Sequence, residues 1–232
     1  MKVIFCIPTH SGSIESECHS SLVTAYAILR EKGIEYDEFI VKGCPYVQIA
    51  RNNLVAMFMN DKDATDLFFI DADVGFDALD VVKILERKEG VVSGIYPLKR
   101  DLGDFPVKIK MVDDTPIGQG GLIEAELLPT GFMRIKREVI QKMMDSHPEL
   151  RYEISHINID IDLDYAYDLF TIGIREGVLV PEDYAFCKKW ADLGGQLWVL
   201  PDCNFTHIGR KGYEGNYHKY LMSRRRNETV PT

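Results

Sequence analysis

The chain has 232 residues, which suits one large domain, and its hydrophobic content of 46% allows a substantial core. A formal net charge of −9 argues against broad nucleic-acid binding, because that function requires a basic surface. The 5 cysteines are irregularly spaced and form no CxxC pair, which indicates reduced thiols in a cytosolic protein rather than a disulfide framework.

The first half of the chain alternates strand-like and helix-like segments. Short apolar runs and apolar residues at helical spacing predict, in turn, strand 2–8, helix 14–32, strand 35–41, helix 47–60, strand 66–70, helix 77–88 and strand 90–96. This alternation predicts a mainly parallel sheet with helices on both faces. The first apolar run is too short for a signal peptide or a membrane span, so we expect a soluble, cytoplasmic protein without a transmembrane segment.

The second half of the chain is less regular. We expect strands at 107–111 and 122–128 joined by a glycine-rich turn, a segment 131–135 leading into a helix at about 137–146, a helix at 182–193 begun by Pro181, and a last core strand at 196–200. Residues 147–177 follow no clear period, although alternation over 157–167 indicates a half-exposed strand or an ordered insertion. No linker divides the chain, so we expect a single α/β domain with a smaller antiparallel extension.

Two aspartates, Asp71 and Asp73, directly follow the apolar strand 66–70. They point the same way if the strand continues, and two bare carboxylates so placed repel each other. A divalent cation removes that repulsion and offers its other positions to phosphate oxygens. The pair therefore predicts a metal–diphosphate site, with carboxylates on a surface turn as the alternative.

A second acidic pair, Glu182 and Asp183, stands in the first turn of the helix that Pro181 begins. Acidic residues at this position are favoured by the helix dipole, so a purely structural role is one interpretation. The other is a general base, because a helix start fixes the position of the carboxylate relative to an acceptor hydroxyl.

A histidine, His207, follows the last core strand within a segment that ends at Gly209. A lone histidine is more often structural, but imidazole joins carboxylates around manganese-like ions more readily than around magnesium. Cys203 lies nearby, yet no second Cys/His pair accompanies it, so we discount zinc.

Three further segments carry polar residues or glycine where strands end or helices begin. Each has a plain structural reading as a turn or a solvated helix face, and each is also suited to holding a nucleotide or sugar. The glycine patterns of a P-loop or a dinucleotide-binding fold are absent from the sequence. The segments are Pro8-Thr9-His10, Arg51-Asn52 and Thr130-Gly131-Phe132.

These motifs occur in a definite order along the chain. The segments are Ile7-Pro8-Thr9, Arg51-Asn52, Phe69-Ile70-Asp71-Ala72-Asp73, Leu128-Pro129-Thr130-Gly131-Phe132, Pro181-Glu182-Asp183 and Thr206-His207. Together they resemble a GT-A-type nucleotide-sugar glycosyltransferase of the family 2-like group, similar to small enzymes of large DNA viruses and phages. The resemblance implies a GT-A-like, Rossmann-like domain at 1–210, with a nucleotide-binding half at about 1–100 and an acceptor half at about 101–210, followed by a basic tail at 211–232.

The resemblance also implies an activity and residue roles. It implies inverting hexosyl transfer from a UDP- or GDP-sugar to a hydroxyl of a glycan, a lipid-linked sugar or a glycoprotein. Asp73, with Asp71 and His207, would hold Mn²⁺ or Mg²⁺, and Asp183 beside Glu182 would be the catalytic base. The donor nucleotide would contact Pro8, Thr9, His10, Arg51, Asn52, Asp71 and Ala72, and the sugar would contact Thr130, Gly131 and Phe132.

Two other functions remain open at this point. A sugar-nucleotide nucleotidyltransferase uses a similar sheet and metal-bound aspartates, but it would normally carry a basic, glycine-rich loop after the first strand. Here that loop, from Pro8 to Gly12, has no lysine or arginine. A non-catalytic module that binds a nucleotide sugar is the alternative outside the enzymes.

Overall fold

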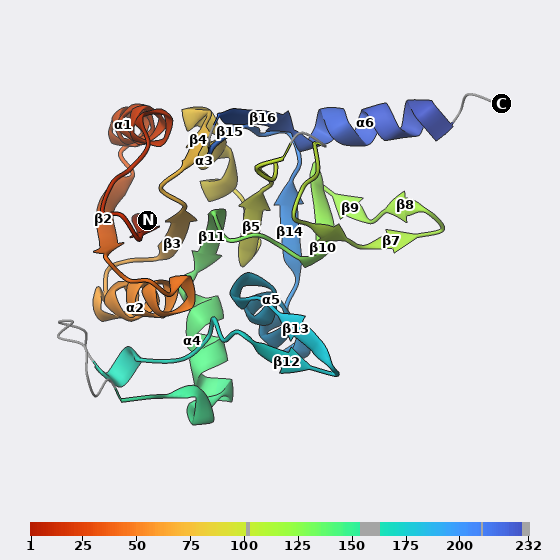
Figure 1. The fold of residues 1–232 in the computed structure, drawn as a ribbon. Helices are drawn as coiled ribbons and strands as arrows, with labels where there is room; N and C mark the ends of the chain where they lie inside the picture. The colour runs from red at the N-terminus through yellow and green to blue at the C-terminus, as the bar shows by residue number, and fades with distance from the viewer. Residues whose placement is uncertain (101–102, 154–162, 210, 229–232) are drawn as a thin grey trace.

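A computed structural model describes residues 1–100, 103–153, 163–209 and 211–228 of the chain. It has a mixed α/β architecture organised around one large sheet (Figure 1). The neighbouring strands across this sheet are β2 (Glu35–Lys42), β1 (Lys2–Thr9), β3 (Asp66–Ile70), β11 (Phe132–Lys136), β5 (Val91–Gly94), β14 (Leu197–Leu200), β10 (Leu122–Leu127) and β6 (Lys108–Ile109), with β9 (Gly118–Gln119) also paired to β10.

Most strands of the large sheet point in one direction. β1 is parallel to both β2 and β3, and β14 is parallel to β5. β11 lies antiparallel between β3 and β5, so those two strands also share a direction. The predicted fold class, an α/β fold with a mainly parallel sheet, is therefore confirmed, with β10 as a further antiparallel strand beside β14.

Helices cover both faces of this sheet, as the alternating sequence predicts (Figure 1). Their bounds are α1 (Ser16–Glu31), α2 (Val47–Asn60), α3 (Ala78–Leu85), α4 (Arg137–Ser146), α5 (Glu182–Asp192) and α6 (Tyr217–Glu228). Along β1, Ile4 and Cys6 pack with residues of α2, α4 and α5, whereas Phe5 and Ile7 pack with residues of α1 and α3. The two sets alternate because successive side chains of a strand point to opposite faces.

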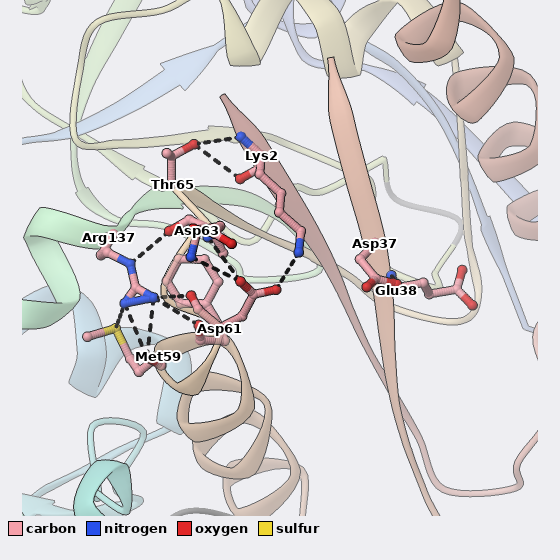
Figure 2. Close-up of polar contacts among 10 residues, drawn as sticks. Lys2, Asp37, Glu38, Met59, Asp61, Asp63, Thr65 and Arg137 are labelled. Atoms are coloured by element: carbon pink, nitrogen blue, oxygen red, sulfur yellow. Dashed lines mark hydrogen bonds and ion pairs between the residues drawn. The ribbon is translucent and has the colours of Figure 1, made fainter. Parts of the chain in front are cut away.

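Two arginines, the partly buried Arg137 and the buried Arg134, hold the ends of helices beside the sheet. Arg137, at the start of α4, donates to the carbonyl groups of Met59 and Ala64 at and beyond the end of α2, with distances of 3.2 and 2.7 Å (Figure 2). Arg134, on β11, donates in the same way to the carbonyls of Ile84 and Arg87 near the end of α3. These contacts satisfy carbonyl groups that a helix end leaves without partners, and they fix the ends of α2 and α3 beside the sheet.

A smaller antiparallel sheet lies beyond the carboxyl end of β3. It pairs β4 (Val74–Phe76), β15 (Asn204–Ile208) and β16 (Gly212–Asn216), in the order β16-β15-β4. The sequence patterns did not predict β4, because a run of three residues carries no readable period. The division of the chain at residue 210 stays a prediction; residues 211–228 comprise β16 and α6, with Tyr217 buried.

The remaining elements are two hairpins and short turns of 3₁₀ helix. The hairpins are β7 (Met111–Val112) with β8 (Thr115–Pro116) and β12 (Gly173–Arg175) with β13 (Val178–Val180), and the 3₁₀ turns are Pro148–Leu150 and Leu163–Tyr165. The strand expected at 107–111 is instead divided between β6 and β7. Of the strand or insertion expected at 157–167, residues 157–162 lie outside the described part of the chain.

Candidate active site

The paired aspartates lie in a turn at the carboxyl edge of the large sheet. β3 ends at Ile70, and the backbone N–H of Val74 donates to the carbonyl of Asp71 at 3.0 Å. The strand does not continue through the pair, because this turn redirects the chain into β4 and the smaller sheet. As a result the two carboxylates have different partners.

Arg51 joins the first aspartate to the acidic pair of α5. Its Nη2 is 3.1 Å from Oδ1 of Asp71, and its Nε is 3.5 Å from Oε1 of Glu182. The guanidinium carbon lies 5.4 Å from the centre of the Phe69 ring, and the side chain is buried. Burial would lower the pKa of Arg51, but the charges of Asp71 and Glu182 outweigh it and raise the pKa. Three predicted site residues from distant parts of the sequence therefore share one charged cluster.

Asp183 is the most perturbed carboxyl group beside this cluster. Burial, reinforced by the negative charge of Glu182, raises its pKa from 3.8 to about 7. The backbone N–H of Tyr184 donates to its Oδ1 at 2.8 Å and opposes this rise, as does the charge of Arg51. A carboxylate whose pKa is close to neutrality is suited to exchange a proton with a hydroxyl group.

Gly131 is required by a close approach between β3, β11 and Tyr96. Its N–H donates to the Tyr96 hydroxyl at 3.2 Å, and its carbonyl accepts from the N–H of Asp71 at 3.0 Å. A Cβ at this position would stand 2.5 Å from Oδ2 of Asp71 and 2.5 Å from the Tyr96 hydroxyl. Only glycine therefore fits without displacing the Asp71 carboxylate.

Three buried polar atoms at the site have no hydrogen-bond partner among the described residues. Nε of Arg51 faces Oε1 of Glu182 at 3.5 Å, and the other two are Nη1 of Arg51 and Oγ1 of Thr130. A buried donor or acceptor without a partner costs roughly 1–3 kcal/mol, so such atoms are uncommon in folded proteins. The position of Nη1 and Oγ1 beside Asp71 and Gly131 makes both available to a bound ligand.

The second aspartate, Asp73, faces His207. β15 pairs with β4 so that His207 lies opposite Val74, and the N–H of Ile208 donates to the carbonyl of Asp73 at 2.8 Å. Nε2 of His207 is then 3.5 Å from Oδ1 of Asp73. The other oxygen, Oδ2, accepts a hydrogen bond from the ammonium group of Lys99.

The tautomer of His207 follows from its other neighbour. Nδ1 lies 2.8 Å from the carbonyl oxygen of Pro97, and because a carbonyl only accepts, Nδ1 carries the proton. With Nδ1 so engaged, Nε2 is the ring nitrogen that faces the Asp73 carboxylate. An imidazole nitrogen oriented by a carbonyl, beside a carboxylate oxygen, is a donor set that fits a divalent cation.

The protein alone supplies few ligands at this position. Nowhere in the described ranges do three or more His, Cys, Asp or Glu side chains gather as a metal-binding group. Of the predicted metal ligands, Asp73 and His207 lie together, while the Asp71 carboxylate is engaged by Arg51. A cation held by one carboxylate and one imidazole would complete its coordination with phosphate oxygens and water, which is how Mg²⁺ commonly binds.

The other predicted donor-site residues lie at the same edge with partners of their own. The hydroxyl of Thr9 donates to the carbonyl of Ser13 at 2.8 Å, closing the loop after β1, and Nδ1 of His10 lies 3.3 Å from the carbonyl of Cys44. The carbonyl of Ala72 accepts from the N–H of Glu15 at 2.9 Å, which docks the start of α1 on the aspartate turn. Pro8 ends β1 beside Thr9.

Two predicted site residues are instead engaged in packing. Nδ2 of Asn52 donates to Asp168 at 2.8 Å, and its Oδ1 accepts from the N–H of Phe170 at 3.1 Å, so this amide anchors the segment before β12. Phe132 is fully buried, with its ring centre 4.9 Å from those of Phe68 and Phe205. Phe132 therefore lies in the core beneath the site.

Sequence reasoning missed Tyr96 and Lys99, which follow β5. Burial, reinforced by Asp71, raises the pKa of the Tyr96 hydroxyl well above 10.0, so it stays neutral. Burial would raise the pKa of Asp73, but the interactions with His207 and Lys99 hold it below 3.8. A signal was present in the sequence, because residues after a parallel strand reach the same edge as those after β1 and β3.

Comparison with known proteins supports the fold and goes no further. No protein-family model and no curated protein sequence matches the chain. The solved structure of A197 from STIV matches with a TM-score of 0.55 and 22% sequence identity, covering 90% of this chain and 86% of that one. At this identity the likeness shows that the two chains share a fold.

Two looser matches to solved structures have transferase titles. The inositol-1-phosphate CTP transferase from T. maritima has a TM-score of 0.44 and 13% identity, and the match covers 100% of this chain and 98% of that one. A glycosyltransferase involved in glycosylation of the major capsid of PBCV-1 has a TM-score of 0.34 and 9% identity, and the match covers 63% of this chain and 67% of that one. At these TM-scores neither match bears on the activity of this chain. Within the described ranges, no helix combines the length and the apolar character needed to cross a bilayer.

Proposed function

We propose that this chain is a metal-dependent glycosyltransferase that moves a sugar from a UDP- or GDP-sugar to an acceptor hydroxyl. The observation that carries the proposal is the position of Arg51 between Asp71 and Glu182, at 3.1 and 3.5 Å. This arginine joins the aspartate pair after β3 to the acidic start of α5, next to a carboxyl group with a pKa of about 7. This arrangement would hold a charged donor beside a proton acceptor at one edge of the sheet.

Asp183 is the proposed base. It takes the proton of the acceptor hydroxyl as that oxygen forms a bond to the anomeric carbon and the bond from this carbon to the diphosphate breaks. Its pKa of about 7 lets it hold or release this proton near neutral pH. Glu182 raises the pKa of Asp183 and is itself oriented by Arg51. Attack from the face opposite the diphosphate inverts the anomeric configuration.

The donor is proposed to lie between the loop after β1 and the aspartate turn. Nη1 of Arg51 has no partner among the described residues and is available to a phosphate oxygen. Thr130 and Gly131 border the same position, where the absence of a Cβ lets the Asp71 carboxylate and the Tyr96 hydroxyl lie close to the backbone. Mn²⁺ or Mg²⁺, held by Asp73 and His207, would supply positive charge for the leaving diphosphate.

The proposal is tested by incubating the protein with UDP- and GDP-sugars and Mn²⁺. Release of nucleoside diphosphate that depends on an added glycan, lipid-linked sugar or glycoprotein and disappears in Asp183→Asn supports the glycosyltransferase. NMR of the product's anomeric configuration then decides between inversion and retention. Formation of a nucleotide sugar and pyrophosphate from a nucleoside triphosphate and a sugar phosphate would instead identify a nucleotidyltransferase. Binding without turnover would identify a non-catalytic module.

A further inference from the structure

Both oxygens of the Asp73 carboxylate are engaged by the chain itself. Oδ2 accepts from the Lys99 ammonium, and Oδ1 faces Nε2 of His207 at 3.5 Å. The ammonium thus occupies the oxygen of Asp73 that His207 leaves open. A divalent cation bound to this carboxylate would lie close to the Lys99 ammonium. Their positive charges would repel strongly, so the cation and the ammonium cannot both stay in contact with Asp73.

The loop after β5 delivers Lys99 and fixes His207 at the same time. The carbonyl of Pro97 orients His207 at 2.8 Å, and Lys99 follows two residues later. The stem of Lys99 lies against Gly209, where an added Cβ would come within 3.1 Å of its Cδ. One loop therefore positions both side chains that contact Asp73.

The Lys99–Asp73 pair is accessible enough to open. The two side chains are 37% and 35% exposed, so the ammonium can exchange Asp73 for water. Pairs of this exposure contribute roughly 0–1 kcal/mol, which a divalent cation can outcompete. Once displaced from Asp73, the Lys99 ammonium can form an ion pair with the diphosphate of the donor.

We propose that Lys99 competes with the divalent cation for Asp73 and thereby couples metal binding to donor binding. Without donor, Lys99 holds Asp73 and weakens metal binding. With donor, the diphosphate receives the displaced ammonium, so metal and donor bind more tightly together than apart. By linkage, each ligand strengthens the other by the same factor. This inference rests on the proposed function, because it takes Asp73 and His207 as the metal ligands.

Mn²⁺ binding measured by electron paramagnetic resonance tests the coupling directly and needs no turnover. Wild type and Lys99→Met are titrated with Mn²⁺ alone and then with UDP or GDP present. We expect Lys99→Met to bind Mn²⁺ alone about 2- to 5-fold more tightly, the range expected for loss of a competing exposed ion pair. The tightening of Mn²⁺ binding by the nucleotide should shrink at least about 3-fold in the variant.

A matched control is available in a second exposed ion pair. Lys108 pairs with Glu126 at 2.5 Å, with side chains 63% and 42% exposed, at the other side of the large sheet. Lys108→Met should leave Mn²⁺ binding and its coupling to nucleotide unchanged. Thermal unfolding of each variant confirms that it is folded, and Lys99→Gln provides a second test of the same position.

The outcomes separate this inference from the proposed function. Equal or weaker Mn²⁺ binding by Lys99→Met and Lys99→Gln, with Asp73→Asn abolishing binding, would refute the competition and leave the metal site standing. Absence of Mn²⁺ binding in every variant, with and without UDP or GDP, would refute both. Mn²⁺ binding by Lys99→Met but not by wild type in the absence of nucleotide would support the competition in its strongest form.

Discussion

Replacing Asp183 with asparagine isolates the electrostatic cost of the proposed base. In the folded protein its pKa is about 7, compared with 3.8 for the ordinary group. Between these values the folded state keeps the proton while the unfolded state releases it, so stability falls as the pH rises and levels off above about 7. At about 1.4 kcal/mol per pH unit over roughly three units, the ionised carboxylate destabilises the fold by at most about 4 kcal/mol.

Asparagine keeps the oxygen that accepts the Tyr184 N–H but cannot ionise. The free energy of unfolding of Asp183→Asn should therefore match wild type near pH 4 and exceed it by about 2–4 kcal/mol at pH 8. Urea denaturation at several pH values between 4 and 8 measures this difference. Asp192→Asn, an exposed site at the end of the same helix, is the control and should follow the wild-type pH profile.

The same ionisation should govern catalysis. For wild type, kcat/KM should rise with pH through about 7, because only the ionised carboxylate accepts the hydroxyl proton. Asp183→Asn should lose about 100-fold or more of the transfer rate while retaining nucleotide binding. A stability profile of Asp183→Asn with the same pH slope as wild type would refute the assignment of the pKa, and full retention of transfer would remove Asp183 from the role of base.

Three further substitutions test other parts of the structure. Asp73→Ala should abolish transfer while leaving thermal stability within about 1 kcal/mol of wild type, and unchanged turnover both in this variant and in excess chelator would contradict the metal proposal. Gly131→Ala should destabilise the protein by about 1–3 kcal/mol and impair donor binding, because its Cβ would meet Asp71 and Tyr96 at 2.5 Å. Gly173→Ala, where nothing lies within 4 Å of the added Cβ, should be near neutral in both assays. Arg137→Met should lower the free energy of unfolding by about 2–4 kcal/mol, because several carbonyls near the end of α2 lose their donor; a loss below 0.5 kcal/mol in urea would show that water replaces it.

Local sequence patterns were sufficient for the architecture of the first half. The bounds predicted for α2 and β3 coincide with those observed, and the helix expected at about 137–146 is α4. All residues of β3 are buried, as its unbroken apolar run indicates. These features are readable because burial of one face, or of both, imposes a short period on the amino acids themselves.

The same patterns did not reveal which strands become neighbours. β11 inserts antiparallel between β3 and β5, although β5 and β11 are separated in the sequence by the hairpin β7–β8. β4, β15 and β16 form a sheet from strands too short to carry a clear period. Pairing of this kind depends on the path of the connecting segments, which local periodicity does not encode.

By itself the sequence determined the residue types of the candidate site and the sheet edge that holds them. It placed Asp71 after one strand and Asp183 at the start of a helix, because strand ends and helix starts are local features. Only the tertiary structure decided that Arg51 joins Asp71 to Glu182 and that Lys99 contacts Asp73. Those partners come from different parts of the chain. The distances between their charges set the pKa values of the site carboxyl groups and the competition for Asp73, and these distances exist only after the chain has folded.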